Sequence, residues 1–171
     1  MRELVDAERV TRFMRDLGRA ASNETVCYLA GGATAVLVGW RGTTIDVDIR
    51  LEPEEDSLLR ALTDLKEKLR MNVELASPAD FIPLPAGWEE RSPFVVREGR
   101  VTFRHFDPYS QALAKLERGH GRDLADVQAL VERGLVDRSR LRELFEEIRP
   151  ALYRFPAVDE PSFARAVESI S

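Results

Sequence analysis

The feature that most constrains the fold is a pair of aspartates inside a segment that has the pattern of a β-strand. The run TIDVDIRL, residues 44–51, alternates aliphatic and polar side chains, as a strand with one buried face does. Aspartate is depleted in strands, yet Asp46 and Asp48 both lie here and share one face. The opposite face, which is expected to pack on helices, carries Ile45, Val47 and Ile49.

Two carboxylates on one strand face repel each other, and removing water from around them raises the cost further. A divalent cation relieves the repulsion, because Mg²⁺ takes oxygen ligands and is usually held by one or two carboxylates plus substrate phosphates. The alternative is a solvent-exposed strand face without a ligand, since a D-x-D pattern is short and common. The strand alone leaves both interpretations open.

Gly31-Gly32 adds a second feature just upstream. The glycines follow the strand-like run TVCYLA, residues 25–30, and precede a short apolar segment with helical spacing, residues 33–40. A strand that runs into glycines and then a helix presents backbone N–H groups at a point that a phosphate can approach closely. Together with the two aspartates, this arrangement predicts a site for a nucleoside triphosphate and Mg²⁺.

Helix and strand patterns alternate up to about residue 106, and helical patterns follow. We predict an α/β (α+β) fold with a small mixed, twisted sheet of four or five strands and flanking helices. The expected division is an α/β core in residues 1–106 and a helical portion in residues 107–171 that packs on the core. The expected helices are residues 5–17, 33–40, 53–70, 109–118, 123–133, 138–148 and 160–170, and the expected strands are residues 25–30, 44–51, 72–76, 94–97 and 100–106.

The formal net charge of -5 argues against a protein whose whole surface grips nucleic acid. The charge is unevenly spread, because residues 91–122 contain seven Lys and Arg against three Asp and Glu, a net +4. That segment is either a basic face for phosphates or an ordinary solvated surface. Trp88 and Phe94 next to it could stack on a base, although packing in the core is the more common role.

The remaining composition narrows the class of protein. Cys27 is the single cysteine, which excludes an internal disulfide and a cysteine-based metal site. His105 and His120 are too isolated in the sequence to suggest a zinc site. The charged amphipathic N-terminal segment lacks the apolar region of a secretory signal, and no apolar run is long enough to cross a membrane. We therefore expect a cytoplasmic protein with no membrane partner.

Two stretches resemble a known family. The run YLAGGATAVLVGWRGTTIDVDI, Tyr28 to Ile49, is similar to the signature of the DNA polymerase β-like nucleotidyltransferase superfamily, in which a glycine-rich turn and a short helix precede a D-x-D or D-x-E strand. GGxA followed by RGTxxDVDI looks closest to small bacterial nucleotidyltransferase-like proteins, which include the toxin of the AbiE abortive-infection system. QALAKLERGHGRDLADV, Gln111 to Val127, resembles the downstream lysine and RDxxD motifs of that group. The resemblance spans roughly residues 25–135.

The resemblance implies a set of site residues. It implies metal binding by Asp46 and Asp48 with a third carboxylate on a neighbouring strand, for which Glu74 is the candidate and Asp80, which also reads as a helix cap, the reserve. Many catalytic members have Gly-Ser where this chain has Gly31-Gly32, and the serine hydroxyl helps to hold the triphosphate. The implied catalytic residues are Asp46, Asp48, Glu74, Lys115 and Asp123, joined by Asp126, and the implied nucleotide-binding residues are Gly31, Gly32, Arg41 and Lys115.

Several of these residues also have plain structural interpretations. Glu74 fits an exposed strand position, Lys115 a surface helix position, and Asp123 the first turn of a helix. Arg41 and Thr43 lie in the loop before the strand, where they either stabilise a turn or contact a phosphate.

The function that the resemblance implies is transfer of a nucleoside monophosphate from a nucleoside triphosphate to a hydroxyl acceptor, with Mg²⁺ or Mn²⁺ as cofactor. The acceptor is RNA, a protein or a small molecule, and a cognate toxin or antitoxin is a further expected partner. The alternative is a non-catalytic module that binds nucleotide or a partner protein with the same fold. The sequence leaves open the nucleobase, the oligomeric state and the choice between toxin and antitoxin.

Overall fold

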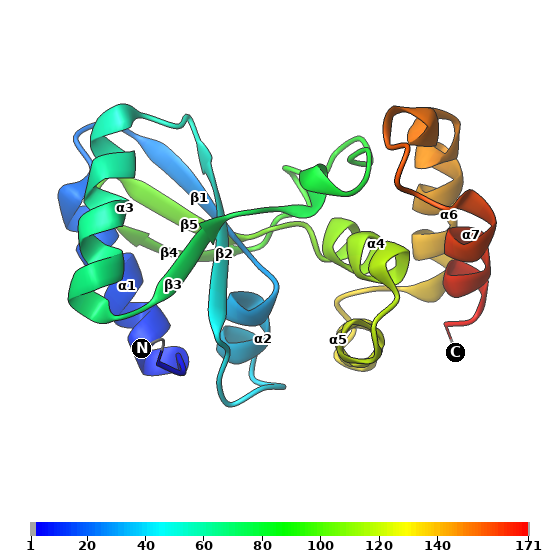
Figure 1. Cartoon of the computed structure of the whole chain (residues 1–171), viewed down its shortest axis with the longest axis horizontal. Helices are drawn as coiled ribbons and strands as arrows, with labels where there is room; N and C mark the ends of the chain where they lie inside the picture. The colour runs from blue at the N-terminus through cyan, green and yellow to red at the C-terminus, as the bar shows by residue number, and fades with distance from the viewer. Residues whose placement is uncertain (1–2, 171) are drawn as a thin grey trace. The chain divides into compact units, whose positions relative to one another are not determined.

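The computed structural model describes residues 3–170, which form two compact units (Figure 1). The first unit contains the chain up to Ala76 together with Pro93–His105, and the second contains Ser77–Ser92 and the chain from Phe106 onward. The predicted α/β fold class is confirmed, because a mixed sheet with helices makes up the first unit and helices make up the second. Each predicted helix and strand is present, with ends within three residues of those expected.

The first unit is built on a five-stranded sheet in the order β3-β2-β1-β5-β4. Strands β1 and β2 are antiparallel, as are β4 and β5, whereas the β1–β5 and β2–β3 pairs are parallel. The sheet is therefore mixed, as predicted. The strands are β1 Thr25–Ala30, β2 Asp46–Glu52, β3 Asn72–Leu75, β4 Phe94–Glu98 and β5 Val101–His105.

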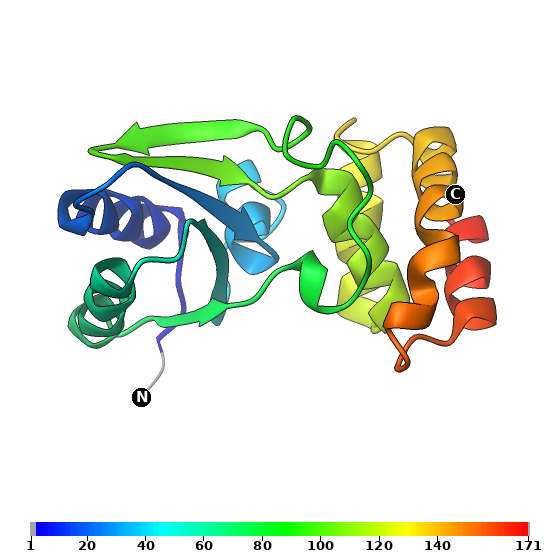
Figure 2. The same cartoon turned by 90° about the horizontal axis from the view of Figure 1, so that it is seen from above.

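One face of this sheet is covered by helices. Helices α1 (Ala7–Ala20) and α3 (Asp56–Leu69) pack against each other on that face (Figure 2), and α2 (Gly32–Val38) follows β1. Asp6 is the N-cap residue of α1, where its carboxylate accepts a hydrogen bond from the Arg9 backbone N–H. The core beneath the helices is apolar and closed to solvent; it includes Phe13, Leu17, Val47, Ile49, Leu51, Leu58, Leu62 and Phe103.

The prediction that Ile45 joins this apolar face is wrong. Ile45 is 46% exposed, whereas Val47 and Ile49 are fully buried. The reason is that the ladder of β2 begins only at Asp46. The residue before Ile45, Thr44, makes a separate bridge to Val5, so Ile45 lies between two short pairings and is not held against the core.

The second unit is helical. Its apolar side chains interdigitate between helices, for example where Phe145 and Phe163 meet edge to face with ring centroids 4.8 Å apart. None of the helices in the described part of the chain combines the length and the hydrophobicity of a membrane span. The elements are the 3₁₀ helices η1 Pro78–Asp80 and η2 Arg149–Arg154 and the α-helices α4 Pro108–Arg118, α5 Gly121–Glu132, α6 Arg138–Ile148 and α7 Glu160–Glu168.

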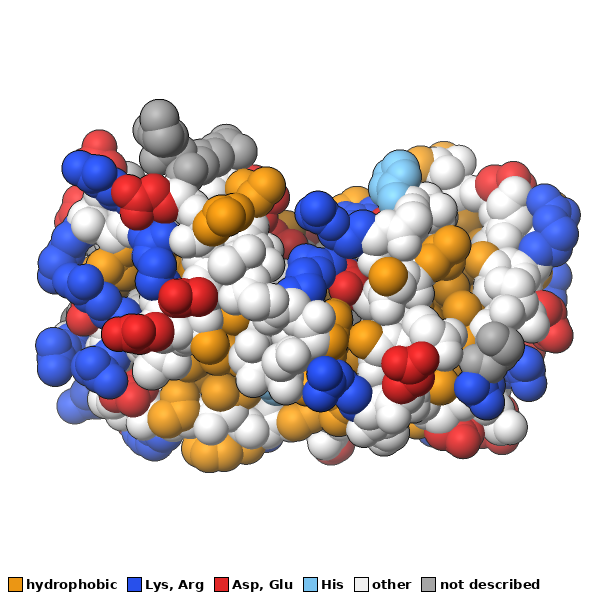
Figure 3. All heavy atoms as spheres, turned by 90° about the horizontal axis from the view of Figure 1, so that it is seen from below, with side chains coloured by type: hydrophobic (Ala, Val, Ile, Leu, Met, Phe, Trp, Pro, Cys, Tyr) orange, Lys and Arg blue, Asp and Glu red, His pale blue; other side chains and the backbone are white. Residues whose placement is uncertain are grey.

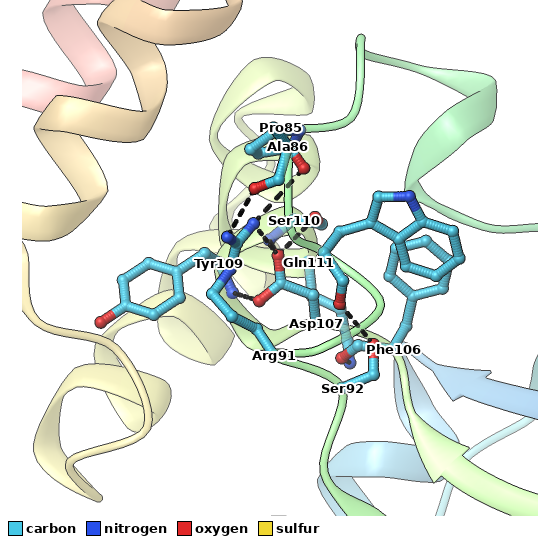
Figure 4. A network of polar contacts seen from close by, with 10 residues as sticks. Pro85, Ala86, Arg91, Ser92, Phe106, Asp107, Tyr109, Ser110 and Gln111 are labelled. Carbon is cyan, nitrogen blue, oxygen red and sulfur yellow. Dashed lines mark hydrogen bonds and ion pairs between the residues drawn. The ribbon is translucent and has the colours of Figure 1, made fainter.

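A partly buried ion pair fixes the proline-rich segment of the second unit to the start of α4 (Figure 4). The Asp107 carboxylate is fully buried, caps α4 by accepting from the backbone N–H groups of Tyr109 and Ser110, and receives the Arg91 guanidinium at 2.9 Å. Arg91 also donates to the carbonyl of Ala86 at 2.7 Å. Arg91 therefore has a structural role, although the sequence counts it among the cations of the basic segment.

Of the two histidines, only His105 is enclosed. Its Nδ1 lies 3.0 Å from the Thr34 hydroxyl, which itself donates to the Leu29 carbonyl, so Nδ1 carries the hydrogen and donates to Thr34. Burial lowers the pKa of His105 from 6.5 to about 4. His105 is therefore neutral in the folded protein near pH 7.

This histidine makes stability depend on pH in a defined direction. Between pH 6.5 and 4 the unfolded chain binds a proton at His105 and the folded chain does not, so the free energy of unfolding falls as the pH falls, by at most about 1.4 kcal/mol per pH unit. Urea denaturation of wild type and His105→Asn, which keeps a donor for Thr34, measures this slope. The slope should be smaller in His105→Asn than in wild type. Equal slopes in the two proteins would contradict the prediction.

Candidate functional site

Asp46 and Asp48 lie where the alternation of the sequence placed them. Val47 and Ile49 of β2 are fully buried beneath α1 and α3, so Asp46 and Asp48, which alternate with them, point to the opposite face of the sheet. Both aspartates are partly exposed. The prediction of two carboxylates on one accessible strand face is confirmed.

The glycine turn touches the second of these aspartates. Ala30, the last residue of β1, is the register partner of Asp48, and Gly31 follows it directly. Gly31 has φ 60° and ψ -126°, a conformation that side-chain-bearing residues rarely adopt. A Cβ at Gly31 would lie 2.9 Å from Asp48 Oδ2. The glycine therefore lets the backbone and a carboxylate approach each other closely, as the expected nucleotide site requires.

The short helix that follows adds little to this turn. Helix α2 has seven residues, and no side chain caps its start. Anion binding here would therefore depend on the backbone N–H groups of Gly31 and Gly32 rather than on a long helix dipole. Arg41 is partly buried and Thr43 is exposed in the loop between α2 and β2, so the structure places both residues in the segment that leads into the strand.

Glu74 lies on the strand next to the aspartates. Strands β2 and β3 pair in parallel with Asp48 opposite Glu74 and Asp46 opposite Asn72, so the structure brings all three predicted carboxylates to the same face. Glu74 is exposed. The reserve candidate, Asp80, instead accepts the Ser77 backbone N–H at 2.9 Å in a capping box at η1.

Asn72 is the residue of this face that sequence reasoning missed. Its side-chain nitrogen donates to Asp46 Oδ1 and, at 3.0 Å, to Glu74 Oε1. The signal was present in the sequence, because strand alternation places Asn72 and Glu74 on the same side of NVEL. Only the register of β3 against β2 shows that Asp46 is its neighbour.

The donor set of this face suits a hard divalent cation. Asp46, Asp48 and Glu74 supply only oxygen atoms, which Mg²⁺ and Mn²⁺ prefer. Among residues 3–170, no three His, Cys, Asp or Glu side chains are grouped so as to hold a metal ion by themselves. Mg²⁺ needs only one or two carboxylates when substrate phosphates complete its coordination, so the two aspartates fit that arrangement. Glu74 as a third ligand stays a prediction.

Lys115, Asp123 and Asp126 form a compact cluster inside the second unit. All three residues are buried; the Lys115 ammonium lies 2.8 Å from Asp126 Oδ2 and 3.9 Å from Asp123 Oδ1. Arg118 also contacts Asp123 Oδ1, at 2.6 Å. Asp123 lies in the first turn of α5, as the structural interpretation expected, and Lys115 is not a surface lysine. The sequence motifs thus identify a group of side chains that the fold does bring together.

The basic segment carries less unbalanced charge than its composition suggests. At least four of its seven cations form ion pairs with carboxylates of the same chain, namely Arg91, Arg97, Lys115 and Arg118. Figure 3 shows Lys and Arg interspersed with Asp and Glu on the face that it displays.

The two aromatic residues near this segment differ. Trp88 stacks on Phe106 with ring centroids 4.6 Å apart, so it packs within the second unit. Phe94 is 59% exposed on β4, and the guanidinium carbon of Arg104 lies 6.0 Å from the centroid of its ring. Core packing therefore accounts for Trp88 but not for Phe94.

Comparison with known families shows to which protein family the chain belongs. A family described as "Nucleotidyltransferase of unknown function (DUF6036)" matches residues 7–160, which include the carboxylate face of the first unit and the Lys115 cluster of the second. The chain belongs to this family. No curated protein and no solved structure matches the chain.

Family membership confirms the nucleotidyltransferase resemblance at this level. It agrees with the mixed five-stranded sheet and with the glycine turn next to the D-x-D strand. It does not extend to the closer relationship with AbiE-type toxins, which stays a prediction, as does the role of every predicted site residue, Asp46, Asp48 and Glu74 included.

The structure gives a physical reason for glycine rather than serine at residue 32. A Cβ at Gly32 would overlap the Thr44 hydroxyl and lie 2.6 Å from Thr44 Cβ. We expect Gly32→Ser to lower the free energy of unfolding by about 1–3 kcal/mol, the usual cost of overpacking a filled site. Chemical denaturation measures the change.

Two further variants test this explanation. Gly32→Ser/Thr44→Gly should recover part of the loss, because the second substitution removes the overlapping atoms. Gly42→Ser is the matched control, since a Cβ at Gly42 meets no atom within 4 Å, and its effect should stay within about 0.5 kcal/mol. A Gly32→Ser protein as stable as Gly42→Ser would show that Thr44 gives way without cost.

Proposed function

We propose that the protein is a Mg²⁺-dependent nucleotidyltransferase that transfers a nucleoside monophosphate from a nucleoside triphosphate to a hydroxyl acceptor. The observation that carries the proposal is the contact between the glycine turn and the D-x-D strand: Gly31 has no side chain where Asp48 Oδ2 approaches it. The carboxylate that we propose as a metal ligand therefore lies next to the turn whose backbone N–H groups we propose as phosphate donors. Membership of a nucleotidyltransferase family supports the same conclusion.

Each residue of the carboxylate face has a defined task in this proposal. Asp46 and Asp48 would hold the cation, which supplies Lewis-acid stabilisation of the charge on the triphosphate. The N–H groups of Gly31 and Gly32 would donate to the β- and γ-phosphates. Glu74 would accept the proton of the acceptor hydroxyl as its oxygen bonds to the α-phosphorus and the bond from that phosphorus to the pyrophosphate oxygen breaks. The products are the nucleotidylated acceptor and pyrophosphate.

The proposal leaves the acceptor as RNA, a protein or a small molecule. A place in a toxin–antitoxin system rests on the resemblance of the GGxA and RGTxxDVDI motifs alone. It is tested by expressing wild type and Asp48→Asn in bacterial cells. Arrest of growth by wild type and not by the variant would support a toxin that acts through this site.

Calorimetric titration with ATP, GTP, CTP and UTP, with and without Mg²⁺, tests the proposed site directly. We expect wild type to bind at least one of them in a Mg²⁺-dependent manner, and Asp46→Ala/Asp48→Ala to lose that binding. A labelled-nucleotide transfer assay with the bound nucleotide then identifies the acceptor. If folded wild type binds none of the four, the nucleotidyltransferase proposal is wrong.

A second candidate function is nucleotide or partner binding without transfer. Two sets of contacts favour it. The Lys115 ammonium group already forms ion pairs with Asp126 and Asp123, and Glu74 already accepts a hydrogen bond from Asn72. The same titration separates the two functions when it is followed by the transfer assay. Mg²⁺-dependent binding without a labelled product for any acceptor class would favour the binding module.

A further inference from the structure

Asn72 joins two carboxylates that belong to neighbouring strands. In the parallel β2–β3 pair Asp46 lies opposite Asn72, and Glu74 is two residues further along β3 on the same face. The Asn72 nitrogen donates one hydrogen to Asp46 Oδ1 and the other to Glu74 Oε1. A primary amide nitrogen has two hydrogens, so this bridge uses the full donor capacity of the group.

The orientation of the amide follows from the chemistry of its partners. The two ends of an asparagine amide are assigned from the hydrogen bonds around them. Ionised carboxylates only accept hydrogen bonds, so the nitrogen of Asn72 must face Asp46 and Glu74. The bridge contacts one oxygen of each carboxylate and leaves Asp46 Oδ2 and Glu74 Oε2 outside it.

A neutral amide has a specific advantage at this place. Hydrogen bonds to charged acceptors are stronger than neutral ones, so the bridge holds two mutually repelling carboxylates in fixed positions. An arginine or lysine at residue 72 would also hold them, but its charge would offset theirs and weaken the attraction of the site for a cation. The amide orders the carboxylates and leaves their negative charge in place.

The geometry points to Asn72 as a positioning residue of the proposed site: its amide holds Glu74, the proposed proton acceptor, beside Asp46, a proposed ligand of the divalent cation. This inference rests on the proposed function, because it assigns the carboxylate face to metal binding. Hydrogen-bond partners of ligating carboxylates typically contribute 10- to 100-fold to metal affinity or activity, which sets the roughly 10- to 100-fold effect expected here.

The test measures metal affinity in the intact chain. Calorimetric titration with Mn²⁺ alone compares wild type, Asn72→Ala, Asn72→Leu, which is close to asparagine in size but has no donor, and Asp48→Asn. A second readout is the Mg²⁺ concentration at half-maximal binding of the nucleoside triphosphate that wild type binds. Asn23→Ala is the matched control, because Asn23 also donates to a carboxylate, Glu55 Oε2 at 2.9 Å, beyond the far end of β2.

The expected result is a 10- to 100-fold loss of Mn²⁺ affinity and a corresponding rise in the Mg²⁺ midpoint for both Asn72 variants, with Asn23→Ala like wild type. Wild-type values in the Asn72 variants, together with loss in Asp48→Asn, would overturn the positioning role and leave the proposed function intact. A wild type that responds to neither Mn²⁺ nor Mg²⁺ would overturn both. Thermal unfolding of each variant confirms that folded protein is compared.

Discussion

Replacement of Asp48 by asparagine is expected to reduce nucleotide transfer by roughly 10²- to 10³-fold or more, because the change removes one negative charge from the proposed cation site and keeps the size of the side chain. Of the two aspartates, Asp48 is the one to replace, because its Oδ2 lies next to the glycine turn that we propose as the phosphate site, close to where a Cβ of Gly31 would be. Transfer of a labelled nucleotide at saturating Mg²⁺ gives the ratio of rates.

A carboxylate on the same strand provides the control. Glu52 shares the face of Asp48 on β2, four residues along the chain, and is exposed with its carboxylate paired to Arg50 at 2.7 Å. Glu52→Gln makes the same chemical change away from the glycine turn and should leave the rate within about twofold, as expected of an exposed position outside the site. If Asp48→Asn keeps more than a tenth of the wild-type rate while it remains folded, the cation is held elsewhere.

The helices and strands could be predicted because each is marked by a pattern within its own stretch of sequence. The alternation in TIDVDIRL indicated the buried and open faces of β2, and Asp80, read as a possible helix cap, does cap η1. The carboxylate pair was predicted for the same reason, since both aspartates lie on one strand.

Features that depend on the pairing of distant segments were not predicted. The register of β3 against β2 places Asn72 beside Asp46, and nothing in either segment alone specifies it. The same holds for the ion pair of Arg91 with Asp107, 16 residues away, which gives a predicted surface cation a structural role at a partly buried position. Sequence composition counts charges, but only the fold shows which of them are paired.

Lys115 shows how a sequence motif and a structural role can coincide. The lysine and RDxxD stretches were assigned to a nucleotide site by resemblance, and in the structure their side chains form one buried ion-paired cluster. The Lys115 and Asp126 side chains are only 10% and 3% exposed. Removal of one partner of a buried ion pair leaves an uncompensated charge, so a loss of activity on substitution of Lys115 would not by itself demonstrate a phosphate contact.

Lys115→Met is therefore expected to lower the free energy of unfolding of the second unit by about 3–5 kcal/mol, because it removes the ammonium group that lies 2.8 Å from the buried Asp126 carboxylate. Urea denaturation followed by circular dichroism measures the change. Lys68→Met is the matched control: Lys68 is largely exposed, its ammonium lies 3.9 Å from Asp16, and its loss should cost less than about 1 kcal/mol.

The double variant Lys115→Met/Asp126→Leu separates the interaction between the two side chains from the effect of removing each one alone. It removes both charges and should recover part of the stability, and the difference from the sum of the single variants measures the coupling. If Lys115→Met is as stable as Lys68→Met, the buried pair does not stabilise the unit. A loss of nucleotide affinity in that stable variant would then favour phosphate binding as the role of Lys115.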